Sequence, residues 1–168
     1  DRESGPNRVV DRHAVRIAVA ALEVVVQAFV QKESLCRADA QIYIIISAGD
    51  FVGASPANSA LLQDEPSIQF LNTLANSYCF DKMNPRCNIV ATVGNHEFDE
   101  GVTELQRMIN GGNHAKGPFL ETPYGGAHYP FVAANVLDTV TGQPILPPYV
   151  IKTIRNTPIA FIGAVLKD

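Results

Sequence analysis

The sequence predicts an α/β fold in which helices cover a largely buried sheet. Segments whose apolar residues recur every three or four positions alternate with short, continuous apolar runs rich in β-branched residues. Polar residues and glycines follow directly after two of these runs, at the strand ends where open α/β sheets bind ligands. With 46% apolar and 18% charged residues, the 168-residue chain is too apolar for a disordered protein and long enough for one core.

The first part of the chain contains two expected helices and two expected strands. Residues 14–32 show helical spacing with a wide apolar face. IYIIIS at 42–47 is typical of a strand that is buried on both faces, as in parallel sheets between helix layers. A second helix is expected over residues 67–76, and NIVATV at 88–93 is expected to form a second buried strand.

The second part begins with a helix expected over residues 101–109, which a glycine-rich segment ends. PFVAANV at 130–136 is a third candidate strand. Residues 149–154 and 159–165 are expected to pair as a hairpin around a turn at 155–158. The helical side chains expected to face the core are Ile68, Leu71, Leu74, Val102, Leu105 and Ile109.

Charge and hydropathy argue against two classes of partner. The net charge is −4 and no basic cluster is present, so no nucleic-acid partner is expected. The longest apolar stretch, at 14–30, is interrupted by Arg16, Glu23 and Gln27 and is too short to cross a bilayer, so no membrane span is expected. The sequence begins DRESGPNR, without an initiator methionine or a signal peptide, and is therefore expected to be a processed or cut piece.

The chain has three cysteines, of which Cys79 and Cys87 flank the polar segment FDKMNPR. A disulfide between these two is plausible in an oxidising compartment, and two unrelated free thiols are the alternative. The spacing of the cysteines fits no standard zinc motif, and Cys36 adds no further signal.

Asp50 follows directly after the expected strand at 42–47, in the sequence Ala48-Gly49-Asp50. A carboxylate in this position suits divalent metals and can bridge two ions. A turn residue or helix cap is the alternative, because aspartate is common in turns.

The segment TVGNHEFDEG at 92–101 places the polar side chains of Asn95, His96, Glu97 and Asp99 close together at the end of the expected strand at 88–93. The amide oxygen of Asn95 is a candidate metal ligand, and His96 is a candidate ligand, general acid or cationic hydrogen-bond donor to a phosphate oxygen. Asp99 can accept a hydrogen bond from the imidazole, which orients the ring and raises its pKa. Glu97 is expected to be a solvated turn residue.

These motifs together resemble the calcineurin-like metallophosphoesterase superfamily, and GNHEFD with its trailing glycine resembles the 5′-nucleotidase branch. The resemblance covers about residues 41–168. Its further segments are GDFVGASPANSALLQDEPSIQFLN at 49–72, PFVAANVLD at 130–138, PPYVIKTI at 147–154 and IAFIGAV at 159–165.

The resemblance implies an α/β/β/α sandwich, of which residues 1–168 hold only the first part, without the C-terminal substrate-binding domain. It also implies a site with two divalent metal ions, which zinc, manganese, magnesium or iron can supply. In the family pattern, Asp50 bridges the metals and Asn95 binds one of them. His96 stabilises charge on the phosphoryl group or helps the leaving group depart, and Asp99 pairs with it.

The function implied is a metal-dependent phosphoester hydrolase, foremost a 5′-nucleotidase that releases phosphate from nucleoside monophosphates by means of a metal-activated water. The alternatives are a phosphoesterase acting on cyclic nucleotides, nucleotide-sugars or other phosphodiesters, and a non-catalytic nucleotide-binding remnant. The expected partner is a nucleotide or another small phosphoester. The family's usual location predicts a periplasmic or extracellular protein.

The sequence departs from the family pattern at both ends. The family has an Asp-x-His at its first strand, and Asp11-Arg12-His13 has this form. However, a helix is expected immediately after His13, which favours solvated helix-start residues over metal ligands. The downstream histidines of the family are missing, and His114 and His128 are expected to be surface residues. The isolated chain is therefore expected to show little or no activity.

Overall fold

The computed structural model describes residues 43–166. The expectations for Asp11, His13, Cys36 and the helix at 14–32 lie outside these residues. In chain order, the elements are β1 Ile45–Ser47, α2 Ala57–Ala60, α3 Glu65–Leu74, η1 Ser77–Phe80, β2 Ile89–Thr92, η2 His96–Phe98, α4 Gly101–Asn110, β3 Phe131–Val132, β4 Tyr149–Ile154 and β5 Thr157–Ile162.

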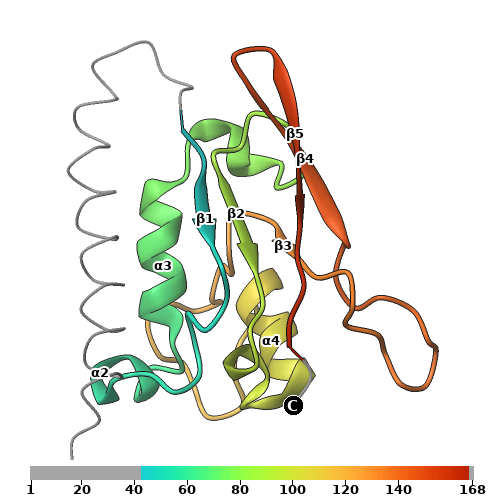
Figure 1. Cartoon of the computed structure of the whole chain (residues 1–168). Helices are drawn as coiled ribbons and strands as arrows, with labels where there is room; N and C mark the ends of the chain where they lie inside the picture. The colour runs from blue at the N-terminus through green and yellow to red at the C-terminus, as the bar shows by residue number, and fades with distance from the viewer. Residues whose placement is uncertain (1–42, 167–168) are drawn as a thin grey trace, which may run out of the picture. The chain divides into compact units, whose positions relative to one another are not determined.

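Three short strands form a parallel sheet in the order β1-β2-β3 (Figure 1). Ile45 is in register with Ile89, and Ala91 is in register with Phe131. Each connection between neighbouring strands contains helices, as parallel pairing requires. The carboxyl ends of β1 and β2 consequently lie at the same edge of the sheet.

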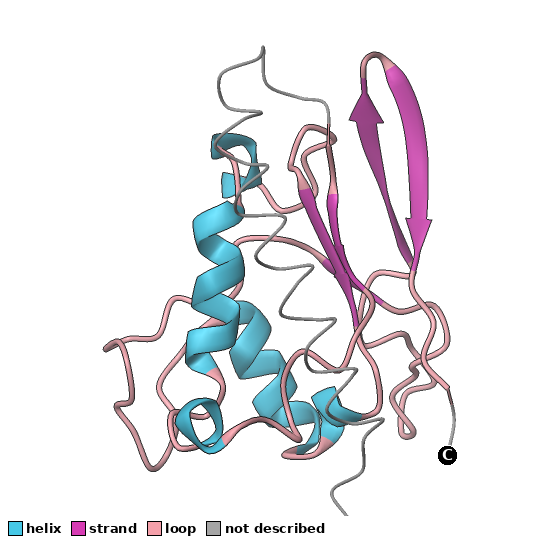
Figure 2. Ribbon diagram, turned by 60° about the vertical axis from the view of Figure 1, so that its left-hand side comes forward, coloured by secondary structure: helices cyan, strands magenta, loops and turns pink. Residues whose placement is uncertain are grey.

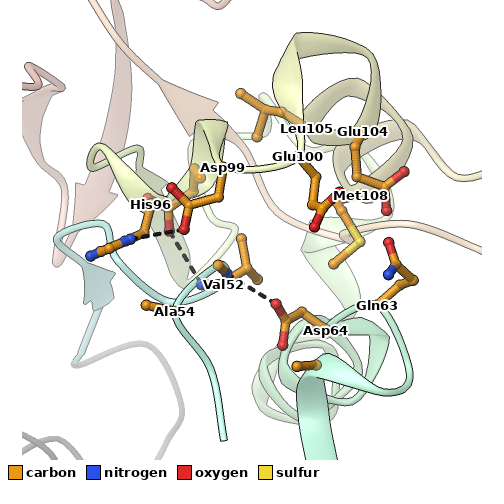
Figure 3. A pocket seen from close by; sticks show the side chains of 13 residues that line it. Val52, Ala54, Gln63, Asp64, His96, Asp99, Glu100, Glu104, Leu105 and Met108 are labelled. Carbon is orange, nitrogen blue, oxygen red and sulfur yellow. Dashed lines mark hydrogen bonds and ion pairs between the residues drawn. The ribbon is translucent and has the colours of Figure 1, made fainter. Parts of the chain in front are cut away.

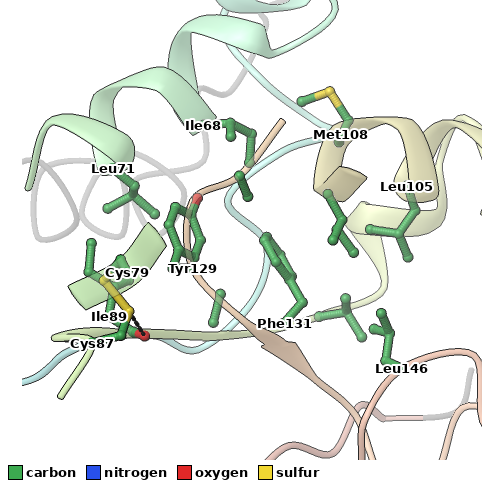
Figure 4. Close-up of a cluster of buried hydrophobic side chains, with 14 of the residues drawn as sticks. Ile68, Leu71, Cys79, Cys87, Ile89, Leu105, Met108, Tyr129, Phe131 and Leu146 are labelled. Atoms are coloured by element: carbon green, nitrogen blue, oxygen red, sulfur yellow. Dashed lines mark hydrogen bonds between the residues drawn. A yellow bond between two sulfur atoms is a disulfide. The ribbon is translucent and has the colours of Figure 1, made fainter. Parts of the chain in front are cut away.

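Helices α3 and α4 cover one face of this sheet (Figure 2). The apolar side chains of both helices meet alternate residues of β2 in the main core, where Ile89 is fully buried (Figure 4). The buried contributors from α3, α4, β2 and the residue after β2 are Ile68, Leu71, Leu74, Leu105, Met108, Ile109, Ile89, Ala91 and Val93. This core fixes the two helices against the strands that carry the site.

The hairpin of β4 and β5 covers the other face of the sheet (Figure 2). Val90 and Val132 of the sheet pack against Val150 of β4 in a second, smaller core cluster. The layers are therefore helix, parallel sheet and antiparallel hairpin. This arrangement confirms the predicted α/β class and is consistent with part of the sandwich that the resemblance implies.

The hairpin turn is shorter than the sequence suggested. Arg155 and Asn156 both have positive φ, 47° and 67°, and form a two-residue turn. Such turns match the right-handed twist of the flanking strands. As a result β5 starts at Thr157, and Pro158 lies within the strand instead of in the turn.

Three predictions of burial and extent were wrong. Ile46 is 59% exposed, so β1 is not buried on both faces. Val102 is 46% exposed, because the inward face of α4 is formed by Leu105, Met108 and Ile109. The predicted strand at 130–136 pairs only over two residues, since the chain turns away after Val132.

Cys79 and Cys87 form a disulfide, which settles the alternative that the sequence left open. Both cysteines are buried at the edge of the main core. Next to them, the buried Asn88 side chain donates to the carbonyl of Leu74 and accepts from the N–H of Asn76. The disulfide and Asn88 thus tie the end of α3 to the start of β2.

Within residues 43–166, none of the helices has the length and apolar character needed to cross a membrane.

Candidate active site

Two polar loops meet at the carboxyl edge of the sheet, one after β1 and one after β2. Gly49 of the first loop has φ 97°, and a side chain there would collide with the backbone of Gly94 in the second loop. The two loops therefore approach each other backbone to backbone, which glycine alone permits. This contact places Asp50 beside the GNHEFD segment, as the sequence predicted for two neighbouring strand ends.

Asp50 is exposed and has φ 53°, an uncommon conformation for a residue with a side chain. Its Oδ1 accepts a hydrogen bond from the backbone N–H of His96 at 3.3 Å. Asn95, immediately before His96, is also exposed. The carboxylate of Asp50 and the amide of Asn95 thus lie at the same edge of the sheet, on two adjoining loops.

His96 and Asp99 form the pair that the sequence predicted. Nδ1 of His96 lies 2.9 Å from Oδ2 of Asp99, across one turn of η2. The hydrogen bond to Asp99 raises the pKa of His96; desolvation opposes this rise, and the charges of Asp99, Asp50 and Glu97 reinforce it. Asp99 holds one ring nitrogen, which leaves Nε2 as the nitrogen that can donate to a substrate.

Glu97 is only 4% exposed, so the prediction of a solvated turn residue was wrong. Its carboxylate accepts from the backbone N–H groups of Asp50 at 2.8 Å, Phe51 at 2.7 Å and Gly94 at 2.6 Å. A buried carboxylate needs such donors, and buried loop N–H groups need an acceptor. One feature of the sequence pointed to this role of Glu97. Two tight, glycine-containing loops need a nearby acceptor for their backbone N–H groups.

A pocket of about 150 Å³ adjoins the His96–Asp99 pair, between the loop after β1, α2, η2 and α4 (Figure 3). Asp64, 8% exposed, lies on the opposite side of this pocket from Asp99. Its Oδ2 accepts from the N–H of Gly53 at 2.9 Å, whereas its buried Oδ1 has no hydrogen-bond partner among the described residues.

The two other predicted histidines lie apart from this site. His114 is partly buried against the ring of Phe119 and lies 4.0 Å from Glu104, so the expectation of a surface position holds only in part. His128 is exposed, and its backbone N–H donates to Asn72. Neither side chain contacts the loops that carry Asp50 and His96.

The oxygen atoms of Asp50 and Asn95 at the edge of the sheet are of a chemical type that binds divalent metals. Carboxylate and amide oxygens are suitable ligands, so Asp50 and Asn95 fit two places in a metal's coordination shell. In the part of the chain that the structure describes, no three His, Cys, Asp or Glu side chains gather closely enough to hold a metal ion.

The model of the calcineurin-like phosphoesterase family matches residues 18–150 of the chain. The chain belongs to the calcineurin-like phosphoesterase family. This match confirms the resemblance that GD and GNHEFD suggested. Calcineurin-like phosphoesterases are hydrolases that use divalent metals, which accords with the oxygen donors of Asp50 and Asn95 at the sheet edge.

Similar proteins of this calcineurin-like family are much longer than the chain. Endonuclease YhcR of Bacillus subtilis (strain 168) is 43% identical over 132 residues, which are 79% of this chain and 10% of that protein. Cell wall protein Lmo0130 of Listeria monocytogenes is 42% identical over 129 residues, 74% of this chain and 15% of that protein. A 2′,3′-cyclic-nucleotide 2′-phosphodiesterase/3′-nucleotidase of Yersinia enterocolitica is 29% identical over 123 residues, 73% of this chain and 15% of that protein.

Proposed function

We propose that the chain forms part of the catalytic domain of a metal-dependent 5′-nucleotidase, which releases phosphate from nucleoside monophosphates. One observation carries the proposal: the His96–Asp99 pair, 2.9 Å apart, lies beside Asp50 at the carboxyl edge of the sheet. This arrangement combines a metal-binding carboxylate with a cationic donor for a phosphate oxygen.

In the proposed site, Asp50 and Asn95 would hold the divalent metal ions. When bound, the divalent ions supply activation of water and neutralisation of phosphate charge. His96 donates a proton or a hydrogen bond through Nε2 to the phosphoryl group or the leaving oxygen. Asp99 fixes the tautomer and orientation of the ring, and the raised pKa of His96 keeps more of it protonated near neutral pH.

The second candidate function is hydrolysis of a phosphodiester. The names of the relatives support it, because one is an endonuclease and another is a cyclic-nucleotide phosphodiesterase/3′-nucleotidase. The same residues would serve either reaction, since both need charge neutralisation at phosphorus. The net charge of −4 opposes binding to a nucleic-acid backbone, so a small cyclic nucleotide fits this chain better than a polymer.

The proposed location is periplasmic or extracellular. A buried disulfide between Cys79 and Cys87 supports an oxidising compartment. A relative named as a cell wall protein supports the same location.

The proposed activity is tested by measuring phosphate release from AMP and ring opening of 2′,3′-cyclic AMP in the presence of Mn²⁺ or Zn²⁺. The 168-residue chain is compared with a longer natural chain that contains it. We expect little or no hydrolysis by the 168 residues, because Asp50 and Asn95 alone would bind a metal ion weakly. We expect the longer chain to hydrolyse AMP, with activity lost in Asp50→Asn and reduced at least about a hundredfold in His96→Asn.

Two results would contradict this proposal outright, and two more would change part of it. The first is no metal-dependent hydrolysis of either substrate by the longer chain, and the second is full activity in Asp50→Asn. Cyclic AMP cleavage without AMP hydrolysis would replace the nucleotidase by the phosphodiesterase. Easily measured hydrolysis by the 168 residues would show that the metal site is complete within them.

A further inference from the structure

We propose that Glu97 is a positioning residue, which fixes the loop carrying Asp50 to the loop carrying Asn95 and His96. Its consequence for metal binding rests on the function proposed above, whereas its role in joining the loops does not. Glu97 touches neither a reacting atom nor a proposed metal in this arrangement, because its carboxylate is occupied by backbone N–H groups.

One oxygen of Glu97 accepts from both loops, and the other accepts from the first loop alone. Oε2 accepts from the N–H of Asp50 at 2.8 Å and from the N–H of Gly94 at 2.6 Å, so this one atom joins the loops. Oε1 accepts from Phe51 at 2.7 Å and from Val52 at 3.4 Å. Three consecutive N–H groups of one loop and one N–H of the other therefore converge on a single carboxylate.

The next N–H along the first loop is bound by a second buried carboxylate. Gly53 donates to Oδ2 of Asp64 at 2.9 Å, and a side chain at Gly53 would collide with the backbone of His96. The N–H groups of residues 50–53 are thus all bound by carboxylates from outside their loop. These contacts fix the backbone beneath Asp50, which has the strained φ of 53°.

The contacts require a carboxylate and not an amide. A glutamine at position 97 has one acceptor oxygen, and its NH₂ group would face N–H donors on the other side. If the oxygen took the place of Oε2, the bonds to Phe51 and Val52 would be lost; if it took the place of Oε1, the bridge to Gly94 would be lost. Glu97→Gln changes no volume, so it separates the hydrogen bonds from packing.

The test is amide hydrogen exchange, followed residue by residue by NMR on the metal-free 168-residue chain. In the wild type, we expect the amides of Asp50, Phe51 and Gly94 to be protected well above the rate of an unstructured peptide. In Glu97→Gln, we expect this protection to fall at least about tenfold, while the amides of the β2 core keep theirs. Asp64→Ala, which removes the acceptor of the Gly53 N–H, should lower protection at Gly53.

The matched control is Glu100→Gln. Glu100 is exposed and lies three residues further along the chain. Its substitution by glutamine therefore removes the same charge beside the same site. We expect unchanged exchange at positions 50, 51 and 94. Mn²⁺ titration of the same proteins gives the functional readout: Glu97→Gln should weaken Mn²⁺ binding about 10–100-fold, as other positioning changes near metals do, and Glu100→Gln should not.

The outcomes keep the two proposals apart. Unprotected amides at 50, 51 and 94 in the wild type would overturn the role of Glu97, and this measurement stands even if Glu97→Gln does not fold. Equal loss of protection in Glu97→Gln and Glu100→Gln would overturn it as well. If the 168-residue wild type shows the expected exchange but binds no Mn²⁺, the predicted effect of Glu97 on metal binding fails for this chain, and the role of Glu97 in joining the loops remains.

Discussion

Two acidic residues of one motif, Glu97 and Asp99, have different surroundings and therefore different chemistry. Asp99 has a side chain that is 43% exposed and pairs with a single imidazole. Glu97 is buried and accepts backbone N–H groups from two loops. The difference arises because η2 is a tight 3₁₀ turn, which directs side chains two positions apart to different sides. At the scale of a residue, the surroundings decide which acid orients His96 and which joins the backbone.

The Asp99–His96 contact predicts the effect of Asp99→Asn. The hydrogen bond and charge of Asp99 raise the pKa of His96, so their removal should lower that pKa toward the ordinary value for histidine. The measurement is an NMR titration of the His96 ring in the metal-free chain. Glu100→Gln serves as the control, and an Asp99→Asn titration curve that overlays the wild type would refute the pairing.

The close approach of the two loops predicts the effect of Gly49→Ala. The methyl group of an alanine at this position would collide with the backbone of Gly94. The alanine would also have to adopt a positive φ, which side chains disfavour. We expect a loss of roughly 1–3 kcal/mol in the free energy of unfolding, measured by urea denaturation. Gly112→Ala is the matched control, since Gly112 has a positive φ but open space around it. An equal loss in both variants would mean that conformational strain, and not the loop contact, limits position 49.

At the scale of an element, the connection from α3 to β2 positions the strand that leads into the site. The helix ends at Leu74, η1 follows, and the Cys79–Cys87 disulfide returns the chain to β2. The buried side chain of Asn88, directly before β2, binds the carbonyl of Leu74 and the N–H of Asn76 at the α3 end of this connection. Because β2 leads directly into Asn95 and His96, the connection sets where the second loop begins.

Reduction of the disulfide should destabilise the chain. A link across a sequence separation of eight residues restricts the unfolded state by about 2.5 kcal/mol in the chain-entropy estimate. The free energy of unfolding should fall by about this amount in the double variant Cys79→Ala/Cys87→Ala, measured by urea denaturation. The variant should also lose any response to a reducing agent. A wild-type protein whose stability is unchanged by reductant would exclude a formed disulfide.

At the scale of the whole described part, a buried cation joins the hairpin layer to the connection between α3 and β2. Lys152 of β4 is fully buried, and its Nζ donates to the carbonyls of Lys82 and Asn84 at 3.0 Å each. The hairpin is thereby bound to the disulfide-linked connection as well as to the sheet. Burial lowers the pKa of Lys152 to about 8.

The buried lysine predicts how stability depends on pH. In the unfolded chain Lys152 keeps its ordinary pKa of about 10.4, so between about pH 8 and pH 10 the unfolded state binds more protons than the folded state. The free energy of unfolding contributed by Lys152 should therefore rise with pH across this window. The measurement compares urea denaturation of the wild type and Lys152→Met at pH 7 and pH 9.5. Subtracting the free energy of unfolding of the variant from that of the wild type at each pH removes the contribution of the other titrating groups. A difference that does not change with pH would contradict the lowered pKa.

The helices, the strands and the site motif could largely be predicted, because each depends on local spacing. Ile68, Leu71 and Leu74 are buried as expected, and Asp50 and His96 meet at neighbouring strand ends as expected. The exposure of Ile46 and Val102 could not be predicted, since it depends on which neighbour covers each position. The two-residue turn at Arg155 was missed because strand pairing overrode the turn signal of Pro158.

The sequence by itself determined the α/β class, the family and the pairing of His96 with Asp99, because short-range spacing and one specific motif carry that information. Only the tertiary structure decided that Glu97 is buried and that Asp64 binds the same loop. The N–H groups that Glu97 accepts from Asp50 and Phe51 belong to residues 47 and 46 positions away. No local sequence pattern predicts such a contact, because it forms only when two parallel strands bring their carboxyl ends to one edge of the sheet.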